Sequence, residues 1–179
     1  MKRTTYLITL FAVIFTLVAK ATIKSDRIEV YKQTNQGNLS LHIFEPPHGL
    51  KQKSAPAIVF FFGGGWSGGT PKQFYQQAVE FSSKGFMAFS AEYRVSKTHK
   101  TTPFECVEDG KSAVRWIREN AGVLGVDPNR IVSAGGSAGG HVAACTGIIK
   151  GLEVGNIKIS SVPNAMILYN PVIDTTEKG

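Results

Sequence analysis

The run PAIVFFF at residues 56–62 constrains the fold more than any other part of the chain. It is continuously apolar and rich in β-branched and aromatic side chains, so it predicts a strand that is buried on both faces. A second such run, FMAFSAEYRV, occupies residues 86–95, and further strand-like runs follow at residues 130–136 and 164–174. Strands of this kind are typical of a mostly parallel sheet that has helices on both of its faces.

Helical patterns alternate with these runs. Residues 71–85 predict a helix in which Thr70 is the N-cap and Gln73 completes a capping box. Residues 102–120 predict a second helix, with a capping box made by Thr102 and Glu105. The apolar face of this second helix is expected to consist of Phe104, Val107, Val114, Ile117 and Ala121.

Two strands are predicted near the N-terminus, at residues 27–32 and 39–44, with a turn at residues 35–38. The residues 125–130, GVDPNR, predict a further turn. The order of elements is therefore two strands followed by alternating strands and helices, which predicts an α/β fold with six strands. In such sheets, ligands bind outside the carboxyl ends of the strands.

The first 21 residues have the features of a signal peptide. Lys2 and Arg3 form a basic region, an uncharged apolar stretch follows at residues 6–18, and Ala19 and Ala21 supply an A-x-A cleavage site. An uncleaved membrane anchor is the alternative, although the apolar stretch is short for a span. We therefore expect a secreted or periplasmic protein without stable membrane insertion, with a single domain that covers residues 22–179.

Composition excludes some functions. The net charge of +7 is modest and scattered along the chain, and it does not favour nucleic acid as a partner. The two cysteines, Cys106 and Cys145, both fall in predicted helices, so two buried thiols are expected rather than a disulfide. We expect neither a metal site nor a cofactor.

The sequence GGSAGGH provides the strongest chemical signal. Gly135, Ser137 and Gly139 fit G-x-S-x-G, the nucleophile elbow, in which a serine lies on a tight turn between a strand and a helix. The helix N-terminus favours negative charge on a tetrahedral intermediate, and the N–H of Ala138 is placed to donate to it. A turn that needs glycines only for close packing is the alternative.

A second glycine-rich stretch, FFFGGGWSGGT, occupies residues 60–70, directly after a predicted strand. It fits a dinucleotide site, a triphosphate site or an oxyanion hole. The spacing of Gly63, Gly65 and Gly68 satisfies G-x-G-x-x-G, and Glu92 ends the next strand, where a ribose-binding acid is expected.

Three observations disfavour a dinucleotide. The following helix starts only at Pro71, two strands precede the motif, and a secreted protein rarely meets nicotinamide cofactors. A P-loop would need a lysine at Thr70. The remaining interpretations are a sharp surface turn or, given the elbow downstream, the second half of an oxyanion hole.

Together FFFGGGWSGG, SAEYRV, VRWIREN, GVDPNRI and GGSAGGH resemble an α/β-hydrolase over about residues 25–175. The sequence is similar to esterases and lipases of the hormone-sensitive-lipase type and to the acetyl-xylan/feruloyl-esterase-like group. The resemblance implies that Ser137 is the nucleophile and that Gly64, Gly65 and Ala138 supply the oxyanion N–H groups.

One residue departs from the family pattern. The resembling family has His-Gly-Gly-Gly, and Phe62 stands here in place of that histidine. The family's histidine shapes the loop and is not the base. Its hydrogen bonds must therefore be replaced in this chain, or be absent.

The sequence offers no clear candidate for the base that would activate the serine or for the acid that would orient that base. The order in α/β-hydrolases is Ser, then Asp or Glu, then His. His141 lies one helical turn after Ser137 and is expected to pack beneath the elbow, and Asp174 is expected to end the last strand rather than act as the acid. Three further histidines are expected to be ordinary surface residues: His42, His48 and His99.

We therefore expect the first six of eight strands of the fold, in a chain that is incomplete at its C-terminal end and inactive alone. The complete protein is expected to be a secreted serine carboxylic-ester hydrolase that acts through an acyl-enzyme. The resemblance suggests carbohydrate acyl esters as substrates. A prolyl-oligopeptidase-like peptidase and a catalytically inactive binding protein are the alternatives.

Overall fold

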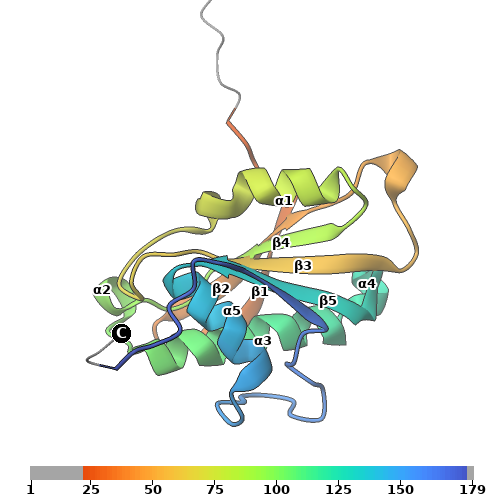
Figure 1. Cartoon of the computed structure of the whole chain (residues 1–179). Coiled ribbons are helices and arrows are strands. Elements are labelled where there is room, and N and C mark those ends of the chain that lie inside the picture. The colour runs from red at the N-terminus through yellow and green to blue at the C-terminus, as the bar shows by residue number, and fades with distance from the viewer. Residues whose placement is uncertain (1–21, 177–179) are drawn as a thin grey trace, which may run out of the picture.

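The computed structural model describes residues 22–176, which form a mixed sheet of six strands in the order β1-β2-β4-β3-β5-β6 (Figure 1). The predicted signal peptide lies outside the described residues. The strands are β1 (Arg27–Thr34), β2 (Gly37–Phe44), β3 (Ala55–Phe61), β4 (Met87–Ala91), β5 (Val126–Gly136) and β6 (Ala165–Tyr169). The first two are antiparallel to their neighbours, and β3, β4, β5 and β6 are parallel.

Helices cover both faces of the sheet. Figure 1 shows α1 on one face and α3 and α5 on the other. These helices are α1 (Tyr75–Ser82), α3 (Pro103–Glu119) and α5 (Ala138–Ile148). Shorter turns of helix are η1 (His48–Leu50), η2 (Pro71–Phe74), α2 (Ser96–His99) and α4 (Ala121–Leu124). The predicted α/β class, with a mostly parallel sheet between helical layers, is confirmed.

The core follows from the apolar runs. Every residue of β4 is buried, and in β3 only Pro56 has partial exposure, as expected for strands that are covered on both faces. The α3 capping box is present, because Glu105 accepts from the Thr102 N–H at 2.7 Å and the Thr102 hydroxyl accepts from the helix backbone. Cys106 and Cys145 are free and buried, as predicted, and burial raises the pKa of the Cys106 thiol to about 12.

Several predicted boundaries were wrong. The hairpin turn consists only of residues 35–36, because Thr34 pairs with Gly37. The residues 127–130 belong to β5, but they bulge from it, since the pairing with β3 shifts there. The strands predicted at 86–95 and 164–174 are shorter, since β4 spans only Met87–Ala91 and β6 only Ala165–Tyr169.

The predicted apolar face of α3 was wrong at Phe104, which is 69% exposed. Ala121 is buried in the core, as predicted, but it starts the separate helix α4. Phe104 lies in the first turn of α3 and lines a cavity between α3 and α5, so no side chain covers it fully. Helical spacing shows which residues share a face, but it does not show how far the covering surface extends.

A buried ion cluster attaches α3 to the sheet. The Asp109 carboxylate is fully buried and accepts from the Arg94 backbone N–H at 3.0 Å and from two nitrogens of the Arg94 guanidinium at 2.8 Å each. The Lys32 ammonium donates to the same carboxylate at 2.6 Å. The cluster therefore ties β1, α3 and the segment after β4 together, and this segment supports the glycine-rich stretch described below.

We predict that Asp109→Ala lowers the free energy of unfolding by about 3–5 kcal/mol, because it removes the fully buried carboxylate that Arg94 and Lys32 share and leaves these cations with only the partly exposed Glu108. Urea unfolding measures this. The control is Glu80→Ala, which breaks an exposed pair with Lys84 and is expected to cost no more than about 0.5 kcal/mol. Equal losses in the two variants would contradict the role assigned to the cluster.

Candidate active site

Ser137 lies at the turn between β5 and α5 with φ of 54° and ψ of −122°. This conformation is strained for a residue that has a Cβ atom, and it persists only where the surroundings enforce it. Here the Ser137 N–H donates to the Tyr169 carbonyl at 3.0 Å, and the Ser137 carbonyl accepts from the N–H groups of His141 at 3.0 Å and Val172 at 3.3 Å. The turn is thus bound from β6, from α5 and from the segment after β6, and the serine side chain is exposed.

The two glycines of the G-x-S-x-G pattern have no room for a side chain. A Cβ atom on Gly135 would lie 2.3 Å from the Gly139 carbonyl oxygen. A Cβ atom on Gly139 would lie 2.1 Å from the Phe61 carbonyl oxygen and 2.3 Å from that of Phe62. The end of β3 therefore packs directly against the first turn of α5, backbone on backbone.

The glycine loop, which we define as residues 63–70, lies against this elbow. A Cβ atom on Gly63 would lie 2.9 Å from the Gly136 carbonyl oxygen and 3.3 Å from the Ser137 Cβ atom. Gly64 and Gly65 have φ values of +143° and +59°, which favour glycine. The loop is therefore shaped by backbone conformations that other residues rarely adopt.

Three amides near Ser137 are free. Within residues 22–176, the N–H groups of Gly64, Gly65 and Ala138 donate no hydrogen bond. A cavity of about 480 Å³ opens beside the serine and is bordered by Gly64 and Ser137. The structure therefore brings the four predicted site residues to one end of the sheet, with unpaired donors beside an exposed hydroxyl.

The structure shows what replaces the histidine that Phe62 displaces. The Phe62 ring stacks on the Tyr93 ring, with centroids 4.1 Å apart and planes 15° apart. The Tyr93 hydroxyl donates to the Phe62 carbonyl oxygen at 2.5 Å. Burial raises the pKa of this phenol, so the hydroxyl remains protonated and able to donate. Gly69 packs on the Phe62 ring, where a Cβ atom would approach to 2.3 Å.

The predicted role of Gln73 was wrong. Thr70 does accept from the Lys72 N–H at 3.4 Å, so it caps η2 as expected. The Gln73 side chain, however, does not complete a capping box, and its Oε1 atom accepts instead from the Gly63 N–H at 2.5 Å. The segment starts as the 3₁₀ helix η2, and the Gln73 side chain bonds to the glycine loop.

His141 packs beneath the elbow, as predicted. Its Nδ1 atom lies 2.9 Å from the Val172 carbonyl oxygen, and its Nε2 atom lies 3.4 Å from the Cys145 sulfur. Because a carbonyl oxygen accepts only, Nδ1 carries the proton and Nε2 accepts from the thiol. Both ring nitrogens are therefore engaged, and His141 does not face the Ser137 hydroxyl.

The prediction that His42 is an ordinary surface residue was wrong. Its side chain is 13% exposed, and its Nδ1 atom lies 2.6 Å from the Tyr75 hydroxyl. Its Nε2 atom lies 3.5 Å from a carboxylate oxygen of Glu92, and this histidine is the main cause that lowers the pKa of that carboxyl. His42 thus joins β2, the segment after β4 and α1, and an alternating strand pattern gives no sign of that contact.

The remaining candidates lie apart from the serine. His48 is exposed in η1, and the Nδ1 atom of His99 accepts from the Val95 N–H at 2.9 Å. Asp174 is exposed and accepts from the Thr176 N–H at 2.9 Å, which lowers the pKa of its carboxyl. Among the described residues, the Ser137 hydroxyl has no hydrogen-bond partner, so no base or acid stands beside it in this part of the chain.

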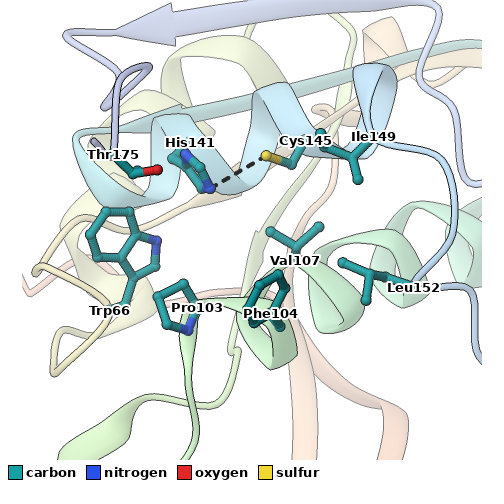
Figure 2. Close-up of a pocket in the computed structure, with 9 residues that line it drawn as sticks. All are labelled: Trp66, Pro103, Phe104, Val107, His141, Cys145, Ile149, Leu152 and Thr175. Carbon is teal, nitrogen blue, oxygen red and sulfur yellow. Dashed lines mark hydrogen bonds between the residues drawn. The ribbon is translucent and has the colours of Figure 1, made fainter. Parts of the chain in front are cut away.

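A second cavity of about 380 Å³ lies behind the elbow helix (Figure 2). Figure 2 shows the His141 and Cys145 side chains of α5 facing Phe104 and Val107 of α3, with Trp66 at one end. Its lining is mainly apolar, and burial raises the pKa of the Cys145 thiol. It shares no lining residue with the cavity at Ser137.

Among residues 22–176, no three His, Cys, Asp or Glu side chains are grouped in a way that would hold a metal ion. No helix in the same range is long and apolar enough to cross a membrane.

A parallel sheet with an antiparallel start, a serine elbow after β5 and a glycine loop after β3 define an α/β-hydrolase. The BD-FAE family model matches residues 41–176, and the chain belongs to this family.

Known proteins agree with this assignment. The carboxylesterase NlhH of Mycobacterium tuberculosis is 33% identical over 109 residues, which are 60% of this chain and 33% of NlhH. The esterase Est2 of Thermogutta terrifontis, in a propionate-bound structure, is 46% identical with a TM-score of 0.79, over 86% of this chain and 57% of that chain. A structure of the same esterase phosphonylated by cyclosarin is 44% identical with a TM-score of 0.81, over 88% and 61%. The chain thus spans about a third of NlhH and about three fifths of Est2.

We predict that Gly139→Ala lowers the free energy of unfolding by at least about 2 kcal/mol, because the added methyl group would collide with two backbone carbonyls that cannot move independently. The control is Gly122→Ala in α4, where a Cβ atom meets nothing within 4 Å. This control is expected to be neutral or slightly stabilising. Urea unfolding measures the free energy of unfolding of both variants. A Gly139→Ala protein as stable as the control would contradict the close backbone contact between β3 and α5.

Proposed function

We propose that the protein is a serine carboxylic-ester hydrolase with Ser137 as its nucleophile. The observation that carries the proposal is the strained, exposed Ser137 at the start of α5, with the unpaired amides of the glycine loop beside it. Strained backbone at such a turn is typical of functional sites. The similarity to NlhH and Est2, which are both named as esterases, supports the same activity.

The proposed reaction has two stages. The Ser137 Oγ atom attacks the acyl carbon of the ester, its proton passes to a base, and the carbonyl oxygen becomes an oxyanion. The N–H groups of Gly64, Gly65 and Ala138 donate to that oxyanion. The intermediate collapses, the alcohol leaves with the proton, and water then releases the acid from the acyl-enzyme and restores the serine.

The proposal needs a base and an orienting acid from outside the described residues. His141 is engaged by Val172 and Cys145. Of the other described histidines, His42 bonds to the Tyr75 hydroxyl, His99 bonds to a backbone N–H and His48 lies exposed in η1. In serine hydrolases the histidine takes the proton of the serine, and a carboxylate orients the histidine. The elbow and the glycine loop would therefore supply the nucleophile and the oxyanion donors of the complete site.

The substrate proposed is a small ester. Est2 has been solved with propionate and with butyrate bound, which supports short acyl groups. In this chain Phe74 and Tyr169 border the cavity at Ser137, with ring centroids 5.9 Å apart, and they offer an apolar wall for such a group. Carbohydrate acyl esters, suggested by the family resemblance, and secretion, suggested by the predicted signal peptide, are the further parts of this proposal.

We predict that the full-length protein is labelled by a fluorophosphonate and that Ser137→Ala is not. The same substitution is expected to lower kcat for p-nitrophenyl acetate by at least about 10⁴-fold, because it removes the nucleophile. The fold should persist, since the side chain is exposed and makes no hydrogen bond in the described range.

The control is Ser83→Ala, at an exposed serine that follows α1 and whose hydroxyl bonds only to the Glu80 carbonyl in the described part of the chain. It should be labelled like the wild type. A wild-type protein that resists the reagent, or a Ser137→Ala protein that is labelled at the wild-type rate, would refute the proposal. Turnover of a peptide amide at a rate similar to the ester would indicate a peptidase.

A further inference from the structure

The donor amides of the glycine loop need something that fixes their direction. An oxyanion hole works because its N–H groups point at the developing charge before the reaction begins. Gly64 and Gly65 have positive φ values, and glycine is the residue with the greatest backbone freedom. A loop of this composition would lose its alignment unless its neighbouring peptide units were held in place.

One peptide unit before the free amides is held at both of its polar edges. Its carbonyl oxygen, from Phe62, accepts from the Tyr93 hydroxyl at 2.5 Å. Its N–H, from Gly63, donates to Gln73 Oε1 at 2.5 Å. The two side chains come from different segments, one after β4 and the other in η2. We call this arrangement the peptide clamp.

The clamp also lies next to the nucleophile. Gly63 is buried, and a Cβ atom added to it would lie 3.3 Å from the Ser137 Cβ atom. Gln73 borders the same cavity as Ser137 and Gly64. Further along, the Gly64 carbonyl accepts from the N–H groups of residues 67 and 68 at 3.1 and 3.2 Å. The Gly64 amide therefore lies between two fixed peptide units, the Gly65 amide belongs to the second of them, and Gln73 holds part of the first.

We propose that Gln73 is a positioning residue of the oxyanion hole, which rests on the esterase function proposed above. By accepting from the Gly63 N–H, it sets the plane of the Phe62–Gly63 peptide and so the direction of the amides that follow. A carboxamide suits this place better than a carboxylate. Its oxygen accepts the hydrogen bond, and it brings no negative charge near an oxyanion.

The alternative is that Gln73 acts only as part of the helix start. Thr70 already caps η2 through its own side chain, and the Gln73 oxygen is turned to the loop instead. A role limited to stability would alter unfolding and leave kcat unchanged. A positioning role alters kcat and leaves KM nearly unchanged, because the oxyanion exists in the transition state and not in the bound ester.

The test compares Gln73→Met with Gln76→Met in the full-length protein. Methionine keeps the length of the side chain and removes the acceptor. Gln76 is exposed at the start of α1, the helix that directly follows η2, and its side chain has no hydrogen bond in the described range, so its variant serves as the matched control. We expect Gln73→Met to lower kcat for p-nitrophenyl acetate about tenfold, with KM within about twofold, and to slow phosphonylation of Ser137 by a similar factor.

Hydrogen exchange of the Gly63 amide provides a second readout that does not depend on turnover. The amide is expected to be protected in the wild type and in Gln73→Glu, whose carboxylate still accepts the hydrogen bond, and to lose protection in Gln73→Met. The Glu variant should nevertheless be slow, since its charge repels the oxyanion. A Gln73→Glu protein that protects the Gly63 amide but hydrolyses the ester slowly would support the positioning role, because it separates the effect of the hydrogen bond from the effect of the charge.

The outcomes are distinguishable. Wild-type kcat in Gln73→Met, or a loss that appears only in KM, would overturn the positioning role while the esterase function stands. Unchanged protection of the Gly63 amide in Gln73→Met would do the same. A wild-type protein that neither hydrolyses the ester nor reacts with the phosphonate would remove the proposed function and, with it, the role of Gln73.

Discussion

The close approach of two backbones is the constraint on which the rest of the site depends. The end of β3 and the first turn of α5 meet so closely that a methyl group on Gly139 would lie 2.1 Å from the Phe61 carbonyl oxygen. This contact exists because β3 and β5 are adjacent parallel strands with Phe61 opposite Gly135, so the two strands leave the sheet at the same level. A serine that follows β5 and amides that follow β3 are consequently brought together by the sheet itself.

Around this contact, the structure holds the glycine loop through side chains from other elements. Asp109 binds Arg94, and the neighbouring Tyr93 binds the carbonyl of Phe62. On the other side, Gln73 binds the N–H of Gly63. The buried ion cluster around Asp109 of α3 is thus connected, through the segment after β4, to the glycine loop beside Ser137. In the proposed oxyanion hole, these contacts would hold the unpaired amides in place before the reaction, as electrostatic stabilisation of an oxyanion requires.

Much of this was predictable from the sequence, and the exceptions share a physical cause. The buried strands and the elbow at Ser137 were predicted correctly because each depends on local pattern: continuous apolar runs, or glycines on either side of a serine. Gln73 and His42 were not, because their partners are distant in the sequence and belong to the glycine loop, to α1 and to the segment after β4. In a capping-box pattern, the glutamine side chain can accept from the N–H of the N-cap residue or from an N–H elsewhere in the fold. Only tertiary packing selects between these two partners. Phe104 was misjudged for a similar reason, since the extent of the surface that covers a helix is not encoded in its periodicity.

The most direct test of the account is a crystal structure of the full-length protein after reaction with an organophosphonate that mimics the tetrahedral intermediate. The account predicts phosphorus bonded to Ser137 Oγ, with the phosphoryl oxygen about 2.7–3.1 Å from the amide nitrogens of Gly64, Gly65 and Ala138. An adduct on a different residue, or a phosphoryl oxygen on Ser137 that turns away from the glycine loop, would contradict it.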